Sequence, residues 1–73
     1  MNIAKIQTTY ITLGQFLKFV GIASGGGDVK ALLANEIINV NGELETRRGR
    51  KLYPDDVVII EDIGSYKIAQ TDD

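Results

Sequence analysis

Two short stretches of this 73-residue sequence carry residue types that bind anions. The first is Ser24-Gly25-Gly26-Gly27, followed by Lys30 and placed directly before a segment of helical pattern. If Ser24 caps that helix, three residues without side chains occupy its first turn, where backbone N–H groups lack partners and the helix dipole is positive. The stretch therefore predicts an anion site that a phosphate can approach closely, and the alternative is a flexible loop between two helices. No Gly-Lys-Ser/Thr follows the glycines, so this is not a nucleotide-binding P-loop.

The second stretch is a run of four basic residues within five positions: Arg47, Arg48, Arg50 and Lys51. Arginine's planar guanidinium matches the geometry of a phosphate better than the point charge of lysine does. The run therefore predicts phosphate contacts, and the alternative is a solvated loop that Glu43 and Glu45 partly neutralise. Lys18 is a weaker candidate, since its simplest role is solubility.

The composition argues against catalysis. The chain has neither histidine nor cysteine, which removes the commonest general base, thiolate nucleophiles and thiolate metal ligands. The pairs Asp55-Asp56 and Glu61-Asp62 fit turns better than metal binding or acid–base chemistry. We therefore expect a protein that is not an enzyme and has no cofactor, metal or small-molecule substrate.

The charge is unevenly distributed along the chain. The net charge is −2, but residues 18–51 carry six basic and four acidic side chains, whereas residues 52–73 carry one basic and six acidic ones. A basic middle is compatible with nucleic acid despite the negative total. No apolar run approaches the roughly 20 residues of a membrane span, and the N-terminus lacks the apolar core of a signal peptide, so we expect a cytoplasmic protein without membrane contact.

Two short amphipathic helices must position these residues. Thr12 and Gln15 form a capping-box pattern, and Leu13, Phe16, Leu17 and Val20 follow on one helical face, with Gly21 as the C-terminal cap. The second helix is predicted to start at Ser24, to bury Val29, Leu32, Leu33 and Ile37, and to stop at a left-handed Asn35.

Strand patterns surround the two helices. Residues 3–11 read as an N-terminal strand, residues 38–40 and 43–45 as a hairpin with a type I′ turn at Asn41-Gly42, and residues 46–51 as a polar loop. A turn at 53–56 precedes a buried strand at 57–60, a second turn at Gly64-Ser65 precedes a strand at 66–68, and residues 71–73 are expected to fray. This order predicts a single α+β domain over residues 1–73, with two short helices packed on a small, mostly antiparallel β-sheet.

At this level the chain resembles the S4 domain (αL motif), an RNA-binding module of bacterial proteins. The resemblance covers about residues 12–60 and rests on Leu13 to Leu17, Ala23-Ser24, Val40-Asn41-Gly42 and Asp56-Val57-Val58. The glycine stretch and Glu45 to Lys51 look closest to the small stand-alone S4 proteins of bacteria, the YaaA/YbcJ-like group. Many family members place arginine directly after the serine, where this chain has Gly25.

The resemblance implies a non-catalytic monomer that recognises structured RNA, such as ribosomal or transfer RNA. The contacts would go to the RNA phosphate backbone, from a basic face formed by the helices and the hairpin loop. The RNA-binding residues expected are Ser24, Gly25, Gly26, Gly27, Lys30, Arg47, Arg48, Arg50 and Lys51. Few aromatic side chains are available for stacking on bases. Two alternatives stay open: DNA binding by the same face, and a protein-interaction adaptor that uses exposed apolar residues and the acidic C-terminal third.

Overall fold

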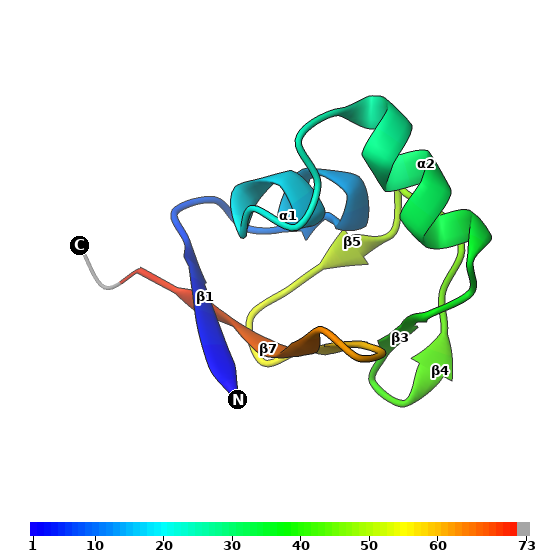
Figure 1. Ribbon diagram of the computed structural model, residues 1–73. Coiled ribbons are helices and arrows are strands. Elements are labelled where there is room, and N and C mark those ends of the chain that lie inside the picture. The colour runs from blue at the N-terminus through cyan, green and yellow to red at the C-terminus, as the bar shows by residue number, and fades with distance from the viewer. Residues whose placement is uncertain (72–73) are drawn as a thin grey trace.

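The protein, described here by a computed structural model over residues 1–71, has one five-stranded sheet with both helices on one of its faces (Figure 1). The strand order in the sheet is β1-β7-β6-β3-β4, and a separate two-stranded sheet pairs β2 with β5. The predicted α+β class, with two helices packed on a mostly antiparallel sheet, is confirmed.

The main sheet is built from β1 (Asn2–Ile6), β3 (Ile38–Val40), β4 (Glu43–Leu44), β6 (Val57–Ile60) and β7 (Gly64–Gln70). Its pairings are antiparallel except that of β1 with β7, which is parallel and places Ala4 beside Ile68. The small sheet consists of β2 (Ile11–Thr12) and β5 (Lys51–Leu52).

The predicted single strand over residues 3–11 was wrong. β1 ends at Ile6, a bend occupies the polar residues 7–9, and β2 begins at Ile11. One local and one long-range hydrogen bond hold the bend: Thr8 Oγ1 donates to the Tyr10 carbonyl, and Gln70 Nε2 of β7 donates to the Thr8 carbonyl. The last strand is longer than residues 66–68, since β1 pairs with it as far as Gln70.

Helix α1 (Leu13–Phe19) forms as the sequence predicts. The Gln15 N–H donates to Thr12 Oγ1 at 3.3 Å and the Thr12 N–H donates to Gln15 Oε1 at 3.2 Å, which completes the capping box. At the other end Gly21 has a φ of +82°, and the N–H groups of Gly21 and Ile22 donate to the carbonyls of Lys18 and Leu17, as in a Schellman motif.

Helix α2 (Gly26–Ala34) differs from the prediction at both ends. Its N-cap is Gly25 rather than Ser24, because the Ser24 side chain hydrogen-bonds the Asp28 carboxylate instead of a helix N–H. Asn35 is right-handed with a φ of −77°, and Glu36 carries the left-handed conformation with a φ of +55°. The chain therefore continues one residue further before it reverses toward β3.

The hairpin between β3 and β4 is confirmed. Asn41 and Gly42 have φ values of +52° and +86°, as a type I′ turn requires. The Asn41 side chain also links the hairpin to the 53–56 turn, since Nδ2 donates to Asp56 Oδ1 and Oδ1 accepts from the Val57 N–H. These two bonds anchor the turn beside the start of β6.

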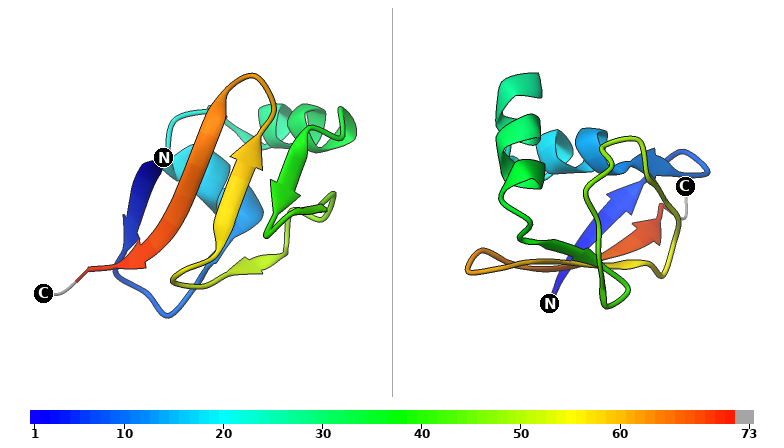
Figure 2. Two further views of the ribbon diagram at one scale, coloured as in Figure 1. Left: turned by 90° about the horizontal axis from the view of Figure 1, so that it is seen from below. Right: turned by 90° about the vertical axis from the view of Figure 1, so that its right-hand side faces the viewer.

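The core lies between the helices and one face of the sheet. Phe16 is fully buried, and the Tyr66 ring of β7 packs edge-on against it with centroids 5.4 Å apart. The predicted full burial of β6 was wrong, because Val58 and Ile60 point into the core while Ile59 is 45% exposed. The second face of the sheet is open, as the left view of Figure 2 shows with the helices behind the strands.

Candidate nucleic-acid interface

The loop between β4 and β5 is organised by one buried carboxylate, Glu45, which is 5% exposed. This carboxylate accepts hydrogen bonds from the N–H groups of Thr46 and Arg47, from Arg47 Nε and Nη2, and from Arg50 Nη1, at 2.8–3.1 Å. The bonds from Arg47, opposed by desolvation and helped by Arg50, lower the pKa of Glu45 to about 2. Glu45 is therefore a structural clamp, a role that the sequence did not reveal.

The clamp divides the four basic residues into unequal groups. Arg47 and Arg50 both form salt bridges with Glu45, and their side chains are 73% and 30% exposed. The same carboxylate raises the pKa of Arg47 above its ordinary value. Both guanidinium groups thus have a partner, while the exposed Arg48 forms no salt bridge with Glu45.

Backbone contacts place Arg48 over the start of α1. The Leu13 N–H donates to the Arg50 carbonyl at 2.8 Å, and the Gly14 N–H donates to the Arg48 carbonyl at 2.9 Å. These bonds satisfy two helix N–H groups that have no partner within the helix. A Cβ on Gly14 would lie 3.4 Å from both the Cβ and the carbonyl oxygen of Arg48, so a side chain larger than a methyl group would displace the loop. The sequence signal for this contact is the glycine inside a helical pattern, which the prediction did not use.

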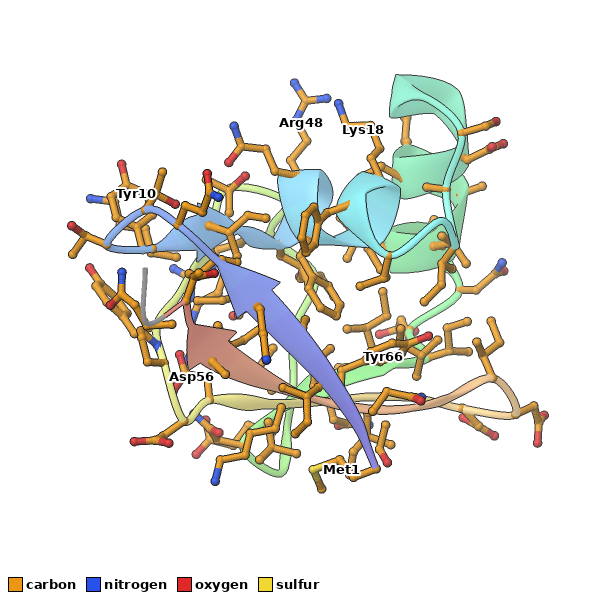
Figure 3. All side chains as sticks on the ribbon, turned by 90° about the vertical axis from the view of Figure 1, so that its left-hand side faces the viewer. Met1, Tyr10, Lys18, Arg48, Asp56 and Tyr66 are labelled. Atoms are coloured by element: carbon orange, nitrogen blue, oxygen red, sulfur yellow. The ribbon has the colours of Figure 1, made fainter. Side chains whose placement is uncertain are left out.

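Arg48 lies beside Lys18 of α1 and close to the start of α2. Figure 3 shows both side chains projecting on the helix side of the molecule, away from the sheet. They line a shallow groove together with Gly26, and its other lining residues are Thr12, Gly14, Gln15, Val29 and Gly49. Within residues 1–71 neither cation lies within salt-bridge distance of a carboxylate.

A second groove continues from Arg48 along α2. It is lined by Lys30, Leu33, Ala34, Glu36, Thr46 and Arg48. Arg48 therefore stands between the two grooves and connects Lys18 on one side with Lys30 on the other. The structure brings together three of the predicted residues, Gly26, Lys30 and Arg48, and adds Lys18 to them.

The start of α2 has open backbone and a nearby negative charge. A Cβ added to Gly25, Gly26 or Gly27 would meet no atom within 4 Å, and none of the three has a positive φ. Neither packing nor backbone conformation therefore requires these glycines. The Asp28 carboxylate accepts from the N–H and the hydroxyl of Ser24, and these bonds lower the pKa of Asp28. Asp28 thus already supplies an anion near this helix end.

Lys51 lies in β5 rather than on the predicted loop. Its Nζ stands 5.0 Å from the ring centroid of Tyr10, and the Tyr10 and Tyr53 rings are 5.8 Å apart with an interplanar angle of 45°. A third groove beside this pair is lined by Arg47, Gly49, Arg50, Lys51 and Tyr53. The remaining predicted cations are thus gathered around an aromatic side chain.

The acidic pairs belong to turns. The Asp56 carboxylate accepts from the Tyr53 N–H at 2.8 Å, and Asp55 and Asp62 have φ values of +79° and +64°. Among residues 1–71, no group of three or more acidic, histidine or cysteine side chains could hold a metal ion. In this part of the chain, neither helix combines the length and the apolar character that crossing a membrane requires.

This chain matches a protein-family model and is similar to a named bacterial protein. A family model of the S4 domain matches residues 4–69, a range that includes both helices, the hairpin and the basic loop. A Bacillus subtilis (strain 168) protein named "Probable ribosome maturation protein RlbA" is 48% identical over 67 residues, which make up 92% of this chain and 94% of the relative. These matches bear out the resemblance drawn from the sequence.

Proposed function

Since the chain belongs to the S4 domain family, we propose that it binds structured RNA through phosphate contacts centred on Arg48 and that it catalyses no reaction. The observation that carries this proposal is the position of Arg48 between two grooves that also contain Lys18 and Lys30. Three cations without carboxylate partners among residues 1–71 stand on the helix side of the molecule. An RNA phosphate backbone that follows the two grooves contacts these three cations one after another.

Arg47, Arg50 and Lys51 have a secondary role in this proposal. The two arginines keep only part of their hydrogen-bonding capacity, because Glu45 accepts from Arg47 through two nitrogens and from Arg50 through one. Each still has N–H groups directed elsewhere, since a guanidinium carries five donors. They add long-range attraction and single phosphate contacts at the edge of the Arg48 surface.

The start of α2 contributes its backbone amides. Gly26 lines the same groove as Arg48, and the glycines leave the first turn uncovered. Asp28 reduces the attraction of this helix end for an anion, so the glycines are useful only where Arg48 and Lys18 already hold the phosphate. Ser24 takes part indirectly in this arrangement, because it fixes the Asp28 carboxylate.

The relative's printed name points to ribosome maturation, and 48% identity over nearly the whole chain makes ribosomal RNA the first target to test. Such a role implies the cytoplasm, where ribosomes are assembled. A monomer is sufficient, because the proposed surface lies within one chain.

Gel mobility of a structured ribosomal RNA fragment at low and at moderate salt tests the proposal. We expect affinity to fall with salt, because each neutralised phosphate contributes about 0.7–0.9 to the slope of log affinity against log salt. Arg48→Ala should lower affinity about tenfold, since a hydrogen bond to a charged group contributes about 1.5–3 kcal/mol. It should also reduce the slope by about 0.7–0.9, the contribution of one phosphate contact.

Lys5→Ala is the matched control, because Lys5 is an exposed cation on β1 and lies outside the grooves. Equal losses in the two variants would show that binding follows net charge and not the Arg48 surface. A DNA duplex of the same sequence, bound as tightly as the RNA, would favour the DNA alternative.

The open face of the sheet favours a second candidate, an adaptor that binds a protein. Ile3, Leu44 and Ile59 are 45–55% exposed there. An adaptor would capture a protein with little dependence on salt and would be unaffected by Arg48→Ala. This combination, without binding of the RNA fragment, would replace the RNA proposal.

A further inference from the structure

We infer that the groove beside Tyr53 binds an unpaired nucleotide, with its base stacked on the Tyr53 ring and its phosphate held by Lys51 and the neighbouring arginines. This inference rests on the proposed function, because it describes a single-stranded segment adjacent to the structured RNA held at Arg48. The unpaired nucleotide is a feature of the RNA that phosphate contacts alone do not select.

The first observation is an aromatic side chain with no core role. Tyr53 is 45% exposed and lines the groove formed by Arg47, Gly49, Arg50 and Lys51. An exposed aromatic ring costs solvation free energy, and the 53–56 turn does not use the ring, since only the backbone N–H and carbonyl of Tyr53 take part in it. Phe16, by contrast, is fully buried, and Tyr66 packs against it.

The second observation is that neighbouring groups hold this platform in place. Tyr10, which is 39% exposed, lies 5.8 Å from Tyr53 at a tilt of 45°, within the range of favourable aromatic pairs. Lys51 Nζ stands over the Tyr10 ring at 5.0 Å, so the cation is restrained beside the groove rather than free in solvent. An aromatic face next to a positioned cation is the combination that binds single-stranded RNA, because every base has a π-face and every nucleotide a phosphate.

The third observation is continuity with the Arg48 surface. Gly49 lines both the Tyr53 groove and the groove that contains Arg48 and Lys18. A strand that leaves a duplex held at Arg48 therefore reaches Tyr53 across a residue without a side chain, where an added Cβ would meet no atom within 4 Å. The site suits one or two unpaired nucleotides at the end of an RNA duplex.

Three RNAs test the inference: a blunt duplex, the same duplex with a short single-stranded 3′ extension, and the same extension made of abasic nucleotides. We expect the extension to raise affinity about tenfold and the abasic extension to give no such gain, because stacking requires the base. Tyr53→Leu should abolish the gain and leave binding of the blunt duplex unchanged, whereas Tyr53→Phe should keep it.

Tyrosine fluorescence gives a readout on the unmodified protein. The chain has three tyrosines and no tryptophan, and Tyr66 is half-buried, so quenching on binding reports mainly Tyr10 and Tyr53. We expect the base-bearing extension to quench this signal and the abasic one to leave it unchanged. If Tyr53→Leu lowers the melting temperature strongly, this fluorescence measurement on the wild-type protein takes the place of the binding assay with that variant.

The outcomes separate the two proposals. Equal binding of the base-bearing and abasic extensions, or a full gain in Tyr53→Leu, overturns the stacking site, while Arg48-dependent binding of the blunt duplex still supports the proposed function. Tyr53-dependent binding of the extended duplex without any binding of the blunt duplex supports stacking and overturns recognition of structured RNA. Failure of every RNA to bind overturns both.

Discussion

Replacing Glu45 with glutamine should destabilise the protein by removing the charge that holds the basic loop. The carboxylate accepts five hydrogen bonds, and its pKa falls from an ordinary 4.5 to about 2. At about 1.36 kcal/mol per pKa unit this corresponds to about 3 kcal/mol of folding free energy. The exposed Arg47 and the partly buried Arg50 cover the carboxylate, so solvent screening lowers the figure and we expect about 2 kcal/mol.

Such a loss is large for a chain of this size, whose total stability is about 4–11 kcal/mol at typical values per residue. Glu45→Gln should lower the melting temperature at pH 7 by about 8–16 °C, as measured by circular dichroism. Glu43→Gln is the matched control, because Glu43 is exposed on the neighbouring strand and forms no salt bridge within residues 1–71.

The pH dependence has a definite sign. Because the pKa of Glu45 is lower in the folded protein, its stabilisation is complete above about pH 4.5 and disappears as the pH falls toward 2. The difference in melting temperature between wild type and Glu45→Gln should therefore shrink over this interval. Equal stability of the two glutamine variants at pH 7, or a difference that persists at pH 2, would refute the clamp.

Two further variants test the helix ends. Gly26→Ala with Gly27→Ala should raise the free energy of unfolding by up to about 1–2 kcal/mol, because the added methyl groups meet no neighbour and alanine favours helix. The same double variant should bind structured RNA more weakly in the gel assay, and stabilisation with unchanged affinity would exclude phosphate contact at these amides. Thr12→Ala should lower the unfolding free energy in urea by about 1 kcal/mol through loss of its bond from the Gln15 N–H. Thr9→Ala, in the exposed bend before β2, should leave it unchanged, and equal losses would contradict the assigned capping box.

The parts of the fold that the sequence predicts are those decided by a few adjacent residues. Thr12 and Gln15 fix the start of α1 because both capping bonds join residues three positions apart. Asn41-Gly42 fixes the hairpin because only residues that tolerate positive φ form a type I′ turn. In each case a short sequence pattern is compatible with one local conformation.

Errors arose where two local solutions compete or where partners are distant in sequence. Ser24 suits an N-cap, but the Asp28 carboxylate at the third helical position captures its N–H and hydroxyl, and the cap moves to Gly25. The burial of Ile59 depends on whether anything covers the outer face of the sheet, which the sequence of one strand does not specify.

The candidate site was predicted as the stretch from Ser24 to Gly27 and five cations, with no distinction among the arginines. Charge counting treats Arg47, Arg48 and Arg50 alike, and only the position of Glu45 shows that two of them are paired. Lys18 lies in the same groove as Arg48 because a backbone hydrogen bond joins Gly14 of α1 to Arg48. This bond links segments more than thirty residues apart in the sequence. The proposed stacking on Tyr53 likewise depends on a groove formed by the folded loop.

The parallel pairing of β1 with β7 has a consequence for biosynthesis. Within residues 1–71, β1 is an edge strand whose one neighbour in the sheet is β7, so β1 is translated long before the strand with which it pairs. Tyr66, which packs against Phe16 of α1, also arrives with that strand. A nascent chain can form its helices and hairpin early, but α1 gains its full support only when translation of β7 is complete.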